Sequence, residues 1–133
     1  MPTDCEHKAA FDRHVASYAD TVDKHPDWAA VMLFYCAVHM VERLFAFDQI
    51  HNTDHGKREF ELKSRYQSLW PEYRVLKSES LKTRYLDGGV FVLSARNVKE
   101  KLHGKRLVNL VADIESRLAA RGMIPPAIVP PTM

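Results

Sequence analysis

The sequence predicts an all-α fold, an up-and-down bundle of four to five helices, on the strength of three observations. Apolar residues recur at helical spacing near both ends of the chain, one central segment is apolar on every side, and proline or glycine bounds the helical segments. The chain has 133 residues, of which 46% are hydrophobic, which suits one domain with one core. We therefore expect residues 1–122 to form a single helical-bundle domain, followed by a proline-rich tail over residues 123–133.

The first helix is expected over residues 4–23, with Asp4 as its cap. One apolar stripe runs along it at spacings of four, three and four residues: Phe11, Val15, Tyr18 and Val22. Pro26 pushes the residue before it out of the helical region, and this separates the first helix from the second.

The second helix is expected over residues 27–47, with Asp27 as its cap, at the centre of the bundle. Every residue from 28 to 38 is apolar, and a helix that is apolar on all sides must be enclosed by its neighbours. His39, Glu42 and Arg43 interrupt the apolar run, which favours a buried helix over a membrane span. The two cysteines form no metal-like pair and the first residues hold no apolar signal-peptide core. We therefore expect a cytoplasmic protein away from the membrane.

The third helix is expected over residues 56–69, with Phe60 and Leu62 as its few apolar anchors. A fourth helix follows from Pro71, because proline suits the first turn of a helix, where its missing N–H costs nothing. Four residues share one face of this helix: Tyr73, Leu76, Ser80 and Arg84.

The last helix is expected between an N-cap at Ser94 and a C-cap glycine at Gly122, after a connector at residues 90–93. Its apolar stripe consists of Leu107, Leu110, Val111, Ile114 and Leu118. Projected back at about 100° per residue, this stripe reaches three polar residues: Arg96, Glu100 and His103. Val98 and Leu102 point roughly the opposite way, and Gly104 marks the change.

Two explanations of this change compete. In the first, the helix kinks or breaks at Gly104, a residue type that costs about 1 kcal/mol in a helix interior. In the second, Arg96 and His103 face a cleft or a second subunit. A plainer interpretation also stands, in which Arg96 and Glu100 form an ordinary i,i+4 ion pair and His103 lies on the helix surface.

Three segments, taken in order, resemble small prokaryotic HEPN-domain proteins. They are DWAAVMLFYCAVHMVER, HNTDHGKRE and YRVLKSESLKTRY, and the likeness spans residues 28–85. In that group an aromatic-rich helix follows a Trp, a loop carries His and Arg, and a later helix ends in a Ser…Arg-Tyr element. The resemblance implies a HEPN-like helical bundle.

Many HEPN domains are metal-independent ribonucleases whose motif is an Arg, four to six residues, and a His. The segment RNVKEKLH fits the upper limit of that spacing with Arg96 and His103. The resemblance implies that these two residues are catalytic, at the interface of a symmetric homodimer. A histidine that titrates near neutral pH suits the proton transfers of RNA cleavage, and the fork of arginine suits phosphate oxygens. Four neighbours would contact the RNA: Asn97, Lys99, Lys105 and Arg106.

The implied function is therefore an endoribonuclease of a toxin or defence system, with RNA as its substrate and no cofactor. The alternative is a non-catalytic HEPN interaction or nucleotide-binding module that pairs with an antitoxin or a nucleotidyltransferase. The proline-rich segment at residues 124–131 suits partner docking equally well. The net charge of +2 does not by itself indicate a nucleic-acid binder.

The polar residues of the resemblance form a second candidate group: His55, Arg58, Ser80, Arg84 and Tyr85. They either make a buried hydrogen-bonded cluster that fixes the helices or a pocket for a nucleotide or phosphate, and we favour the structural role. Two metal-like pairs are weaker. His51 and His55 lack a third ligand nearby, and His39 with Glu42 lacks a matching Glu-x-x-His on another helix. No metal is expected.

Overall fold

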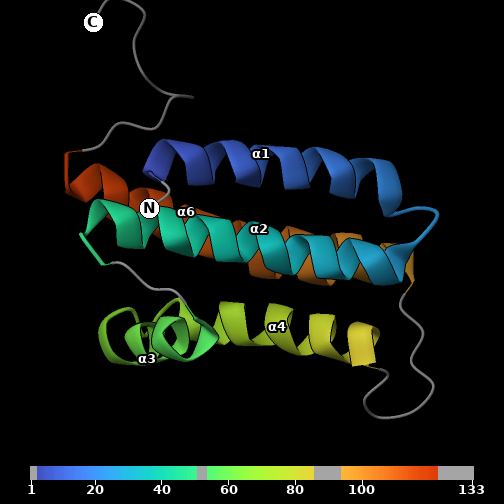
Figure 1. Cartoon of the computed structure of the whole chain (residues 1–133). Coiled ribbons are helices and arrows are strands. Elements are labelled where there is room, and N and C mark those ends of the chain that lie inside the picture. The colour runs from blue at the N-terminus through green and yellow to red at the C-terminus, as the bar shows by residue number, and fades with distance from the viewer. Residues whose placement is uncertain (1–2, 51–53, 86–93, 123–133) are drawn as a thin grey trace, which may run out of the picture.

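The computed structural model describes residues 3–50, 54–85 and 94–122, and these form an all-α bundle, as predicted (Figure 1). Its elements are α1 (Asp4–Thr21), α2 (Pro26–Phe47), α3 (His55–Arg65), α4 (Trp70–Tyr85) and a continuous last helix made of α5 (Ala95–Asn97), η1 (Val98–Leu107) and α6 (Val108–Ala120). The expected connector at residues 90–93 and the tail at residues 123–133 lie outside the described residues. The side chains of Arg84 and Tyr85 do as well.

The bundle is organised around α2, which packs on α1, on α4 and on the last helix. Figure 1 shows that α2, α4 and the last helix each run antiparallel to the long helix before them in the chain. A window of α2 is long and apolar enough to span a membrane by composition alone, but 72% of that window is buried inside the bundle. This burial agrees with the prediction of an enclosed central helix.

The helix N-termini of the first half differ from the predicted caps. Thr3, not Asp4, caps α1: its hydroxyl oxygen accepts from the Glu6 N–H at 3.1 Å, and the Glu6 carboxylate accepts from the Thr3 N–H. α2 begins at Pro26 without a side-chain cap, so Asp27 lies in the first turn, where its charge favours the helix dipole.

The boundaries of the last helix follow the prediction. The Ser94 hydroxyl accepts a hydrogen bond from the Asn97 N–H at 3.0 Å, which is an N-cap contact. At the other end, Gly122 adopts a φ of +86°, the left-handed conformation that closes many helices and that glycine adopts without strain.

The two middle helices are only partly as predicted: the third helix, expected over residues 56–69, ends at Arg65, and α4 begins at Trp70. Leu62 on α3 is fully buried, but Phe60 is 65% exposed, so the prediction of Phe60 as an apolar anchor is wrong. Phe60 lies two residues from Leu62, about 200° around the helix, so it points away from the face that buries Arg58 and Leu62. On α4, Tyr73, Leu76 and Ser80 are all buried, as the shared face predicts.

A run of π-helix removes the contradiction in the last helix. Between Val98 and Leu107 the backbone bonds five residues back, as the Val108 N–H does to the His103 carbonyl. Such turns hold more residues than α-helical turns, so the constant rotation of 100° per residue was wrong here. Six residues now share the core face and are buried: Val98, Leu102, Leu107, Leu110, Ile114 and Leu118.

Gly104 lies in the π turns at a close backbone approach. A Cβ atom added at this position would lie 2.9 Å from the Lys99 carbonyl oxygen. The helix neither breaks nor ends there, and it continues directly into α6. The glycine therefore allows the close backbone approach of the π turns instead of interrupting the helix.

Candidate functional site

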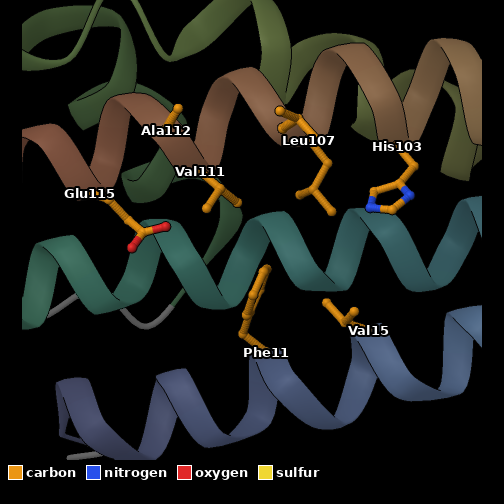
Figure 2. A pocket seen from close by; sticks show the side chains of 8 residues that line it. Phe11, Val15, His103, Leu107, Val111, Ala112 and Glu115 are labelled. Atoms are coloured by element: carbon orange, nitrogen blue, oxygen red, sulfur yellow. The ribbon is translucent and has the colours of Figure 1, made fainter. Parts of the chain in front are cut away.

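An open apolar groove separates α1 from the last helix (Figure 2). It has a volume of about 340 Å³ and is lined by Phe11, Val15, His103, Leu107, Val108, Val111, Ala112 and Glu115. Figure 2 shows Phe11 and Val15 pointing from α1 toward the last helix, with α2 behind them. The groove exists because α1 packs mainly on α2 and leaves the last helix uncovered on that side. An open apolar groove is therefore the first place to look for an interaction or ligand site.

His103, the predicted catalytic histidine, lies at one end of this groove. Its ring meets the edge of Tyr18 on α1 at a centroid distance of 4.9 Å. Half-burial lowers the pKa of His103, so the imidazole is neutral at pH 7 and suited to accept a proton. Burial also raises the pKa of Tyr18 to about 12, and its hydroxyl has no hydrogen-bond partner among the described residues.

Arg96, the predicted catalytic arginine, faces solvent. Its side chain is 82% exposed, and its Nε lies 3.2 Å from Glu100, one turn along the helix. This is the ordinary i,i+4 ion pair of the plainer interpretation. Among the described residues, Arg96 contacts Glu100 and His103 contacts Tyr18, and no contact joins Arg96 to His103.

The residues expected to contact RNA divide into two groups. Lys99 binds Asp23 at 2.6 Å and Arg106 binds Glu72 at 3.1 Å, so the charges of both are already compensated. Asn97 and Lys105 are exposed. The basic surface of the last helix is therefore smaller than its sequence suggests.

The second candidate group forms around Arg58, which is buried between three helices. Its Nε donates to the Glu42 carboxylate on α2 at 2.7 Å, and its Nη1 donates to His55 Nδ1 at 2.8 Å. A longer contact of 3.4 Å reaches the Tyr73 hydroxyl on α4. Lys77 and Glu59 add an ion pair between α4 and α3. These contacts tie the weakly apolar α3 to the bundle.

The composition of this cluster supports the structural role over a phosphate pocket. Glu42 already neutralises the Arg58 charge, and a carboxylate beside the guanidinium repels an anion. Ser80 is fully buried, but its hydroxyl has no partner among the described residues and takes no part in the network. Buried Arg43, 2% exposed, likewise has its Nε and Nη1 without an acceptor in the described part of the chain.

Glu42 and Tyr73 belong to this cluster although the prediction of the site did not include them. A signal for Glu42 was present, because a charged residue inside an apolar, enclosed helix requires a buried partner of opposite charge. Which of the many arginines supplies that partner depends on how α3 lies across α2.

A third polar group joins α1 to α2 and consists of His7, His14 and His39. The Nδ1 atoms of His7 and His39 lie 3.1 Å apart, and the rings of His14 and His39 stack at 5.2 Å. Burial, reinforced by the charges of His14 and His7, lowers the pKa of His39 to about 4. Neutral imidazoles can share one proton in the His7–His39 hydrogen bond, which two charged rings cannot do.

Of the two metal-like pairs, His39 and Glu42 lie within the described residues. The described residues contain no group of three or more His, Cys, Asp or Glu side chains placed to hold a metal ion. His51 lies outside the described residues, and His39 turns toward His7 and His14.

The chain matches no known protein-family model, no curated protein and no solved structure. The HEPN resemblance therefore stays a prediction based on the segments quoted above.

Replacing Arg58 tests the structural role of its cluster. Arg58→Met should lower the free energy of unfolding by about 3–5 kcal/mol, because it leaves the Glu42 carboxylate buried without a partner. Arg65→Met is the matched control on the same helix: Arg65 pairs with Glu61 but is 62% exposed, so the loss should stay below about 1 kcal/mol. Urea unfolding measures both. Equal losses of unfolding free energy in both variants would refute the role of Arg58 in fixing α3 to the bundle.

The pKa of His39 predicts an acid sensitivity. Above pH 6.5 the ring is neutral in both the folded and the unfolded chain. As the pH falls from 6.5 to about 4, the unfolded chain binds a proton that the folded chain refuses, so stability should fall across that window. Urea unfolding of His39→Gln should show a shallower pH slope than wild type, whereas the exposed His25→Gln should retain the slope. An unchanged slope in His39→Gln would contradict the assignment.

Proposed function

We propose that the chain is a HEPN-like protein that acts as a symmetric homodimer through the outer face of its last helix. Gly104, Val108 and Ala112 follow at steps of four residues, so they lie on nearly one face, and all three are exposed. The observation on which the proposal rests is Val108, an apolar side chain that is 48% exposed and lines the open apolar groove. Small residues on either side of it let a second helix approach closely. In a two-fold dimer each copy would bury the same patch.

Arg96 and Glu100 precede Gly104 on the same helix, and both side chains are exposed. A two-fold axis near Gly104 would bring two copies of Arg96 and two of His103 to one shared surface. That would supply the residues that a single chain lacks, since Arg96 and His103 make no contact within one chain.

We further propose that this homodimer is a cytoplasmic, metal-independent endoribonuclease of a toxin or defence system. One neutral His103 would take the proton from a 2′-hydroxyl, and the 2′-oxygen would attack the adjacent phosphorus. The imidazolium formed in this step would then give the proton to the departing 5′-oxygen. Arg96 would stabilise the charge on the phosphate oxygens in the transition state, and exposed Asn97 and Lys105 would contact the RNA backbone.

A second candidate function is a non-catalytic HEPN interaction or nucleotide-binding module that pairs with an antitoxin or a nucleotidyltransferase. One observation favours it: Lys99 and Arg106 are engaged by Asp23 and Glu72 and so offer little charge to RNA. In this case the face around Val108 would receive the partner protein. The two candidates differ in whether the dimer cleaves RNA.

Cleavage of total RNA in EDTA separates the two candidates. The nuclease proposal expects wild type to cleave and to leave 2′,3′-cyclic phosphate ends. His103→Ala and Arg96→Ala should each lose at least about 100-fold in rate, the scale of a lost proton-transfer group. His25→Ala and Arg74→Ala, exposed residues of the same types elsewhere, are the controls and should cleave normally.

The oligomeric state decides how a negative result is understood. Val108→Asp should convert the dimer to a monomer in sedimentation and abolish cleavage, whereas Phe60→Asp, which also alters an exposed apolar side chain, should do neither. If wild type is a dimer but does not cleave RNA, the nuclease proposal is refuted and the interaction module is favoured. If wild type is monomeric at all concentrations, the homodimer proposal is refuted.

A further inference from the structure

The groove between α1 and the last helix lies next to a segment of this chain whose chemistry matches it. Residues 123–131 read MIPPAIVPP, with no charged side chain and with proline at four positions. The lining of the groove is mostly aliphatic, with the rings of Phe11 and His103 on its two sides (Figure 2). Both surfaces are apolar, so their exposure to water is unfavourable in free energy.

We propose that residues 123–131 bind in this groove as an extended polyproline segment of the same chain. The occupant is thus a named part of the molecule and not an outside ligand. Three arguments support it: where the chain leaves the last helix, how far it reaches, and which polar groups it brings.

The last helix directs the chain toward the groove. Val108 and Glu115 both line it, and Gly122 follows after the same step of seven residues, or two turns, so it lies close to the same face. Gly122 has a φ of +86°. That left-handed conformation lets the backbone reverse its direction as it leaves a helix. The next residues can therefore run back along the groove.

The reach of the segment equals the length that it has to cover. From Gly122 back to His103 the last helix extends about 28 Å, at 1.5 Å per residue. Nine residues in the polyproline conformation also extend about 28 Å, at 3.1 Å per residue. Residues 123–131 therefore suffice to pass Glu115, Val111 and Val108 and to arrive near His103.

The segment brings few backbone donors to the apolar lining of the groove. Proline has no N–H, so Pro125, Pro126, Pro130 and Pro131 bring no unsatisfied donor against it. Polyproline segments are already extended before binding, which lowers the entropy that docking costs, and they bind grooves lined by aromatic rings. Ile128 and Val129 supply branched side chains that can pack between Phe11 and Val111.

Docking of the tail would regulate the site described above, an effect that rests on the proposed homodimer. The segment would cover Val108 and Ala112, which the second copy requires. Tail and second copy would then compete, so docking of the tail would weaken dimerisation without abolishing it.

A nitroxide label near the tail's end tests the docking in the full chain. The label is attached to Thr132→Cys in a Cys5→Ser background, since Cys5 is exposed and Cys36 is buried. It should broaden the amide signals of His103, Val108 and Val111. Adding Ile128→Asp and Val129→Asp should restore them. A label on Ser78→Cys, exposed on α4, is the control for unspecific broadening. Groove signals that stay sharp, or broaden no more than those of the other helices, would overturn the proposal.

Sedimentation of the same unlabelled chains separates this proposal from the homodimer. If the tail competes, the Ile128→Asp Val129→Asp chain should dimerise with a dissociation constant lower by roughly fivefold or more. If neither chain dimerises but the tail label broadens the signals of the groove residues, docking of the tail is supported and the homodimer is refuted. If both chains dimerise equally and the signals of the groove residues stay sharp, docking of the tail is refuted and the homodimer is supported.

Discussion

The structure depends on one constraint, that the last helix must bury six apolar residues whose spacing no regular α-helix can bring to one face. The step of five between Leu102 and Leu107 is the irregular one. Burying a Val or Leu side chain contributes about 1.5–3 kcal/mol. Leaving Val98 and Leu102 in water would therefore cost more than a stretch of unusual hydrogen bonds, and the π turns are the result. They also turn Arg96 outward and place His103 beside α1.

Different forces hold the two sides of the bundle. α1, α2, α4 and the last helix share an apolar core centred on α2. α3 buries little apolar surface and is fixed instead by the Glu42–Arg58 pair and its hydrogen bonds. Because a buried ion pair is specific in direction and weak in net stability, it sets where α3 lies more than how stable the protein is. Of the polar residues in the HEPN resemblance, His55 and Arg58 belong to this network, whereas Ser80 is buried outside it.

Much of the fold could be predicted because it follows from local patterns. The enclosed position of α2 follows from an unbroken apolar run, and the ends of the last helix follow from Ser94 and Gly122, whose roles are local. The faces of the last helix could not be predicted with a fixed rotation per residue, since π turns form only when packing demands them. The partner of Arg58 was likewise set by the position of α3, which no local pattern reveals.

The π turns also determine the functional proposals, because they put His103 in the groove and Gly104, Val108 and Ala112 on the outer face. Removing one residue tests them most directly. Deletion of Gly104 leaves steps of four, four, three, four and four along the core face, which a regular α-helix can satisfy. The free energy of unfolding of the Gly104 deletion variant should stay within roughly 1 kcal/mol of wild type. Deletion of Ala112 should cost at least about 3 kcal/mol, because it turns Ile114 and Leu118 away from the core. Equal losses in both variants would contradict the account.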